Sequence, residues 1–122
     1  MNDNERWNLV VDVGKILLNQ VEELEEPLIT YGDLARLLPY EFNPRNLDDP
    51  LGNLSDQCAE MGLPLISTIV VNKDTMQPGA GYFNYFFPGT KELQRIDIFI
   101  EQYDRVKKCR DWTPLAKRLG LK

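Results

Sequence analysis

The sequence contains no histidine, and its only two cysteines, Cys58 and Cys109, stand far apart in 122 residues. Histidine is the usual general acid or base near neutral pH and a common zinc ligand, so its absence excludes both kinds of histidine site. Two cysteines without Cys-x-x-Cys spacing are too few for a disulfide scaffold. We expect both to be reduced packing residues, and we predict a protein without catalytic activity, metal or cofactor.

Long apolar runs are also missing. The longest one, residues 63–71, is interrupted by Ser67 and Thr68 and is far shorter than a bilayer span. The first residues are polar or acidic and do not show the basic and then apolar pattern of a secretory signal peptide. A chain of this length suits one domain. We expect a cytoplasmic protein without a membrane partner.

Positive charge is scarce, because 14 basic residues stand against 19 acidic ones and the net charge is −5. Neutralisation of phosphates supplies most non-specific DNA affinity, so an acidic protein needs a local basic surface to bind DNA. Residues 101–122 contain seven basic and three acidic residues, hence +4. Arg105, Lys107 and Lys108 are therefore candidate DNA-binding residues. Alternatively, these cations end a helix favourably and stay solvated.

Helical spacing of apolar residues predicts three helices in the first half of the chain, over residues 5–23, 31–38 and 50–61. Thr30 is predicted to cap the second helix, with Asp33 three residues later in a variant of the capping box. Asp49 is predicted to cap the third helix, with Pro50 in its first turn. Gly62 is expected to end that helix.

The second half of the chain mixes β-type and helical segments. Residues 65–71 are rich in β-branched side chains and predict a strand. The aromatic run 82–87 is expected to return as a second strand or wing. A long helix is expected over residues 91–109, and a short one begins at Thr113. The long helix should bury Leu93, Ile96, Ile100, Tyr103 and Val106.

This order of elements is typical of a winged helix-turn-helix domain. The predicted fold class is mainly α with a small β wing (α+β), with extra N- and C-terminal helices. We expect a single domain over residues 1–122, with a core at 28–88 and a C-terminal helical appendage at 90–122. Residues 50–61 would then form the recognition helix.

One motif is similar to a known family. Thr30-Tyr31-Gly32-Asp33-Leu34-Ala35 matches the motif that begins the DNA-binding half of the alkylguanine-DNA alkyltransferases, and Leu51-Gly52, Leu63-Pro64-Leu65-Ile66 and Val70-Val71 follow it. Residues 28–82 therefore resemble the C-terminal domain of that family and the non-catalytic alkyltransferase-like proteins. The resemblance implies that Tyr31 contacts the backbone of a flipped nucleotide. It also implies close helix packing at Gly52.

The chain departs from this family at the reactive centre. Ser67 and Thr68 stand where the family has cysteine and histidine, so the activated thiolate that alkyl transfer requires is missing. Asp49 replaces the arginine that the family inserts into the base stack, which weakens the case for base flipping. The run from Asn43 to Lys73 also resembles uncharacterised bacterial and phage proteins of winged-helix type. That resemblance concerns the fold and implies no defined activity. A role in bacterial or phage defence or counter-defence belongs to the DNA-binding hypothesis stated below.

Polar and basic side chains in and near the predicted recognition helix are further candidates for contact with DNA. They are Arg45, Asn46, Asn53 and Ser55, together with Lys73 in the turn after the predicted strand. The same helix carries acids that would face phosphates, namely Asp48, Asp49, Asp56 and Glu60. The alternative is that this helix presents a solvated acidic face.

The aromatic cluster after residue 81 also allows two interpretations. Its rings either pack in the core or stay exposed, where they could stack on bases or anchor a protein partner. The cluster consists of Tyr82, Phe83, Tyr85, Phe86 and Phe87.

Two functional hypotheses follow from these features. The first is a non-enzymatic winged-helix protein that binds DNA. The second is an acidic protein-interaction module, or an inhibitor that mimics DNA, which kept the fold without binding DNA. The acidic balance favours the second, whereas Tyr31, the basic tail and the family resemblance favour the first.

Overall fold

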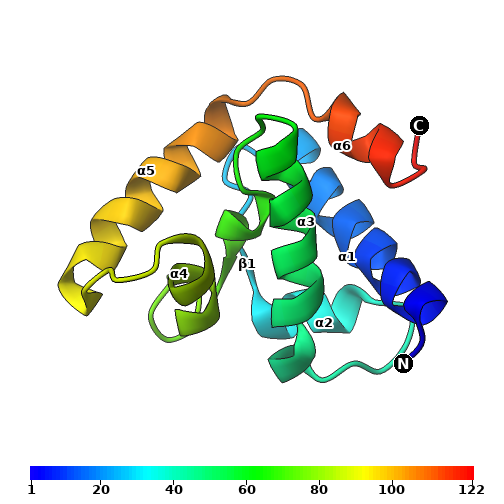
Figure 1. The fold of residues 1–122 in the computed structure, drawn as a ribbon, viewed down its shortest axis with the longest axis horizontal. Helices are drawn as coiled ribbons and strands as arrows, with labels where there is room; N and C mark the ends of the chain where they lie inside the picture. The colour runs from blue at the N-terminus through cyan, green and yellow to red at the C-terminus, as the bar shows by residue number, and fades with distance from the viewer.

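A computed structural model describes residues 1–122 and is mainly helical, with one small sheet. Figure 1 shows α3 in the middle of the molecule, with α1 and α6 on one side and α4 and α5 on the other. No helix combines the length and the apolar composition that crossing a bilayer requires. The elements are α1 (Asp3–Glu23), β1 (Ile29–Thr30), α2 (Tyr31–Leu37), α3 (Asp48–Glu60), β2 (Val70–Val71), α4 (Ala80–Phe86), α5 (Arg95–Lys108) and α6 (Thr113–Arg118).

The three predicted N-terminal helices are present. Thr30 Oγ1 accepts a hydrogen bond from the Asp33 backbone N–H at 3.1 Å, which confirms the predicted cap of α2. The cap of α3 was predicted wrongly. A 3₁₀ turn at Pro44–Asn46 leads directly into the helix, so Asp49 lies in its first turn, where a carboxylate still complements the helix dipole. Gly62 has φ +72° and ends α3 as expected.

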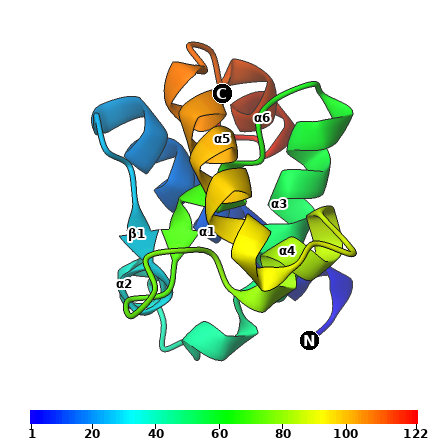
Figure 2. The same ribbon diagram turned by 90° about the vertical axis from the view of Figure 1, so that its left-hand side faces the viewer.

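Residues 66–71, which we call the central segment, are buried between the helices. Only Val70 and Val71 are a strand; the first four residues, Ile66–Ile69, form a 3₁₀ helix. The prediction of one continuous strand over 65–71 was therefore wrong. β2 pairs in parallel with β1, Ile29 with Val70 and Thr30 with Val71, as Figure 2 allows the reader to follow.

The predicted β wing is absent, because the aromatic run forms a helix, α4. Helical spacing places Tyr82 and Phe83 in the core and leaves Tyr85 exposed. Strand-like alternation would have divided the same rings between two faces of a sheet. The fold is thus α+β as predicted, but its sheet joins the entry to α2 with the central segment.

The predicted buried face of α5 was also largely wrong. Leu93, Ile96 and Ile100 are exposed, whereas Phe99 and Val106 are buried. A separate 3₁₀ turn at Glu92–Gln94 precedes α5, and the helix then packs against the first part of the central segment. The face that meets this segment includes Phe99 rather than its apolar neighbours.

Close helix packing occurs at Gly14 of α1, not at Gly52 as the resemblance implied. A Cβ atom at Gly14 would lie 2.6 Å from Leu119 Cδ1 and 3.0 Å from Leu54 Cδ2. A Cβ atom at Gly52 would meet nothing within 4 Å. The backbone of α1 therefore approaches α3 and the C-terminal residues where it has no side chain.

We predict that Gly14→Val lowers the free energy of unfolding by about 1–3 kcal/mol, because the new methyl groups overfill this contact. Gly52→Ala is the matched control and should leave stability equal or raise it by up to about 1 kcal/mol, since alanine favours a helix interior. Urea denaturation of both variants measures the difference. Equal stability of the two would contradict the described packing of α1.

Candidate functional site

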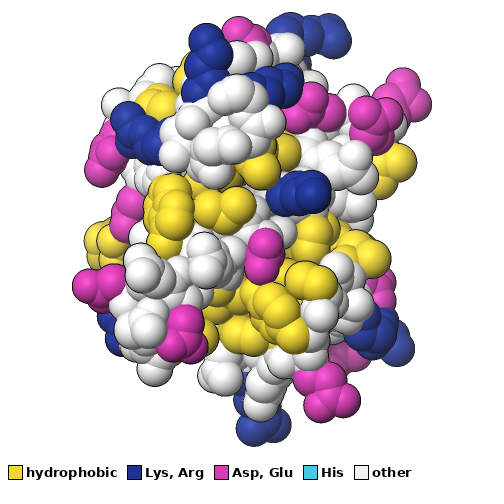
Figure 3. Space-filling model, turned by 90° about the vertical axis from the view of Figure 1, so that its right-hand side faces the viewer, with side chains coloured by type: hydrophobic (Ala, Val, Ile, Leu, Met, Phe, Trp, Pro, Cys, Tyr) yellow, Lys and Arg dark blue, Asp and Glu magenta, His cyan; other side chains and the backbone are white.

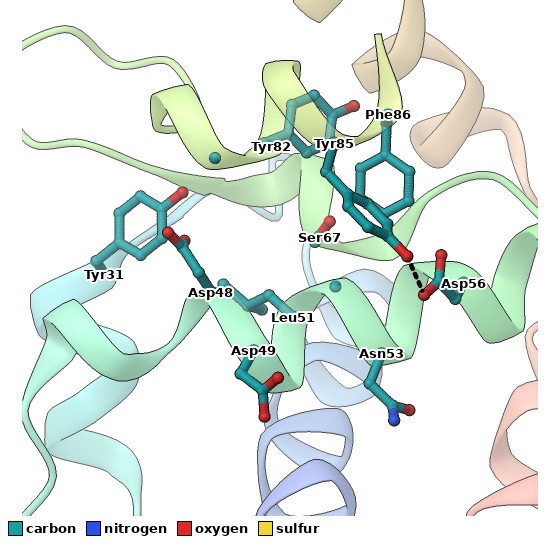
Figure 4. A pocket seen from close by; sticks show the side chains of 12 residues that line it. Tyr31, Asp48, Asp49, Leu51, Asn53, Asp56, Ser67, Tyr82, Tyr85 and Phe86 are labelled. Carbon is teal, nitrogen blue, oxygen red and sulfur yellow. Dashed lines mark hydrogen bonds between the residues drawn. The ribbon is translucent and has the colours of Figure 1, made fainter. Parts of the chain in front are cut away.

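A cavity of about 470 Å³ lies between α3 and α4, and we call it the α3–α4 cavity. Its volume falls in the usual range for ligand sites. Figure 4 shows α3 on one side of it, α4 on the other, Tyr31 at one end and Ser67 at the back. The lining residues are Tyr31, Asp48, Asp49, Leu51, Gly52, Asn53, Asp56, Ser67, Gly81, Tyr82, Tyr85 and Phe86.

The wall on α4 is aromatic. Tyr82, Tyr85 and Phe86 stand at positions i, i+3 and i+4, so the helix directs them to the same side. The ring centroid of Phe86 lies 4.7 Å from that of Tyr85 and 5.6 Å from that of Tyr82. Such edge and tilted contacts fix the rings against each other. The ring cluster was recognised in the sequence, but the helical spacing that assembles this wall was missed.

The wall on α3 is acidic. Asp48 and Asp56 are eight residues apart, which separates them by about 12 Å along the helix axis and by about 80° around it. Both face the cavity in Figure 4, whereas Asp49 and Asn53, which also line it, lie at its rim and point away from α4. The Tyr85 hydroxyl donates a hydrogen bond of 2.8 Å to Asp56, and this bond raises the pKa of Tyr85. No lysine or arginine lines the cavity.

Tyr31 closes one end of the cavity. Its hydroxyl oxygen accepts a hydrogen bond of 2.9 Å from the Gly79 backbone N–H, which ties α2 to the residues just before α4. Burial raises the pKa of the Tyr31 hydroxyl, so it stays protonated at neutral pH. The Tyr31 side chain is half-buried and lines the cavity.

The inner end of the cavity is joined to both walls by buried hydrogen bonds. Ser55 Oγ of α3 donates to Ser67 Oγ at 2.6 Å and accepts from the Ser67 N–H at 3.0 Å. Thr68 Oγ1 lies 2.7 Å from the hydroxyl of Tyr82 on α4. Burial raises the pKa of Tyr82 to about 12. Ser55 was expected to contact DNA, but it is fully buried and reaches only the central segment.

The two cysteines are free, and neither lines the α3–α4 cavity. Cys58 is buried, and burial raises its pKa to about 11. The thiol therefore remains protonated at neutral pH and is a poor nucleophile. Side chains of the types that bind metals do not gather in any group of three or more that could hold an ion.

The candidate cations of the C-terminal tail are held by carboxylates. Arg105 pairs with Glu101 at 3.2 Å, Lys107 with Glu26 at 2.7 Å, and Lys108 with Asp104 at 2.8 Å. Figure 3, which views the side of the molecule where α1 and α6 lie, shows basic and acidic side chains mixed over that face. These pairs reduce the local positive charge that phosphate binding requires.

The remaining candidates lie elsewhere on the molecule. Arg45, Asn46, Asn53 and Lys73 are exposed. Figures 1 and 2 both place the start of α3, next to Arg45 and Asn46, at the opposite end of the molecule from the basic end of α5. Of the predicted residues, only Tyr31 and Asn53 line the α3–α4 cavity. Asp48, Asp56 and the α4 rings join them there.

Comparison of the chain with known protein families, characterised proteins and solved structures gives no match.

We predict that Ser55→Ala lowers the free energy of unfolding by about 1–3 kcal/mol, because the buried Ser67 N–H loses its acceptor. Thr75→Ala is the control, since its hydroxyl bonds at 3.4 Å in an exposed turn and should contribute less than about 0.5 kcal/mol. Chemical denaturation compares the two. Equal effects would contradict the role of Ser55 in holding the central segment.

Proposed function

We propose that this chain is a non-enzymatic protein-interaction module that binds a basic partner protein through the face formed by α3 and α4. The observation that carries the proposal is the composition of the α3–α4 cavity, which combines aspartates and aromatic rings with no basic side chain. Complementary charge steers association and disfavours wrong partners. Tyrosine and phenylalanine are enriched at the centres of protein interfaces.

The charge of the surrounding surface supports the same proposal. Asp49 and Asn53 extend the polar face of α3 to its outer side, and the Asp49 carboxylate has no ion-pair partner within the protein. Glu60 in the last turn is already paired with Arg118 at 2.7 Å and adds no free charge. A helix with this face would place several carboxylates next to phosphates if it entered a DNA groove. A basic protein surface would instead neutralise them.

DNA binding by a helix-turn-helix is the second candidate. The succession of α2 and α3 favours it, and so does the family resemblance of the residues that begin α2. Two exposed basic residues also favour it: Arg45 lies just before α3, and Lys73 lies just after β2. In this version the contacts would be made at the start of α3 and by the loop after β2. The C-terminal candidates Arg105, Lys107 and Lys108 would take no part, because each is already paired with a carboxylate.

A binding experiment separates the two candidates. We predict that a fluorescein-labelled nona-arginine peptide binds at low salt and that Asp48→Asn with Asp49→Asn and Asp56→Asn weakens binding about tenfold or more, as expected when charge-assisted contacts are lost. The control with the same charge change is Glu22→Gln with Glu23→Gln and Glu25→Gln, three exposed acids at the end of α1 and just after it. It should change affinity much less.

The second arm uses a labelled DNA duplex under the same conditions. The proposal expects no measurable binding at low salt. Duplex binding that weakens steeply with salt and is lost in Arg45→Glu with Lys73→Glu would overturn the proposal in favour of the second candidate. Equal weakening of peptide binding by both charge-matched triple variants would show that the α3–α4 face has no special role.

A further inference from the structure

We infer that the α3–α4 cavity receives a single organic cation, the guanidinium or alkylammonium group of a partner's arginine or lysine side chain. This inference rests on the proposed function and specifies what the partner inserts. The cavity has the two chemistries that such a group requires. Its α4 wall supplies ring faces and edges, and its α3 wall supplies carboxylates. Cations are attracted both to aromatic faces and to carboxylates.

The acidic side of the cavity lacks a counter-charge for Asp48. The Asp48 side chain has no hydrogen bond or ion pair within the protein, and the lining contains no lysine or arginine. Asp56, at the other end, already accepts from Tyr85, which holds the carboxylate against the aromatic wall. A guanidinium or ammonium group beside Asp48 would gain charge-assisted hydrogen bonds there, and Asp56 would attract it at longer range. A phosphate or carboxylate at this place would be repelled.

Gly81 makes room for this arrangement. A Cβ atom at Gly81 would lie 2.7 Å from Asp48 Oδ2, closer than any side chain allows. Because α4 has a glycine here, the Asp48 carboxylate can stand against the start of the aromatic helix. The acid of one wall therefore reaches the backbone of the other wall at Gly81. The approach of Asp48 to Gly81 is an observation separate from the number of acidic residues that line the cavity.

Hydroxyl groups complete the lining. The oxygens of Tyr31 and Ser67 each accept a hydrogen bond from within the protein, Tyr31 from Gly79 and Ser67 from Ser55. The hydroxyl of Tyr82 is held by Thr68. The walls are thus fixed by internal hydrogen bonds before a ligand arrives, which reduces the entropy lost on binding. A planar guanidinium suits such a site because its donors are themselves rigid.

The test uses ¹⁵N-labelled protein titrated with N-acetyl-arginine methylamide, and with the citrulline analogue as its neutral counterpart. We expect saturable shifts of the amide signals of residues 48–56 and 80–86 with the arginine compound only. Asp48→Asn with Asp56→Asn should weaken binding about tenfold or more. Asp74→Asn, an exposed acid in the loop after β2, should change it less than about twofold, as screening of surface charge predicts.

A second variant tests the same site without changing charge. Gly81→Ala should displace the Asp48 side chain and weaken binding of the arginine compound. Amide spectra will show whether the fold is retained. Equal binding of the citrulline analogue, or unchanged affinity in the Asp48/Asp56 variant, would overturn the inference. So would shifts confined to other parts of the surface.

Further arms identify the source of the cation and separate this inference from the proposed function. Agmatine and putrescine represent free small cations; tighter binding of either than of an arginine-containing peptide would overturn the assignment to a partner's side chain. If nona-arginine binds but the Asp48/Asp56 variant is unaffected, the inference falls and the basic-partner proposal stands. If the arginine compound enters the cavity but basic peptides do not bind, the proposed function falls instead.

Discussion

The burial of residues 66–71 determines how the rest of the molecule is arranged. Six consecutive residues pass between the helices, and their polar groups must find partners away from water. Ser67 finds Ser55 on α3, Thr68 finds Tyr82 on α4, and Val70 and Val71 pair with β1. Each partner fixes one neighbouring element. The two walls of the α3–α4 cavity are therefore held at a set distance by the same segment that forms the core.

This arrangement explains how an acidic protein can carry a specific site. A net charge of −5 by itself gives only a diffuse preference for basic partners. Here two aspartates of α3 face rings on α4 across an open cavity, and the glycine at position 81 allows Asp48 to approach α4 closely. Specificity for a cation then depends on the shape of the cavity and on its combination of carboxylates and aromatic rings. The surrounding acids supply attraction at longer range.

The sequence predicted the local features well and the tertiary ones poorly. The Thr30 cap, the end of α3 at Gly62 and the helical N-terminal half depend on neighbouring residues, so pattern and propensity were sufficient. The aromatic run 82–87 was predicted as β because its residue types favour strands, but tertiary packing of Tyr82 and Phe83 made it a helix. Likewise, a serine such as Ser55 can contact DNA, but here its side chain is buried because it accepts the hydrogen bond of the buried Ser67 N–H. The cavity needs α3 and α4 side by side, which no local pattern specifies.

The central claim is that residues 66–71 hold the fold together, and native-state hydrogen exchange tests it most directly. The account predicts that the amides of Ser67, Val70 and Val71 exchange only through global unfolding, with the same opening free energy as the best protected amides of α1 and α3. Exchange of these three amides through an opening much less costly than global unfolding, while α1 and α3 stay protected, would contradict it.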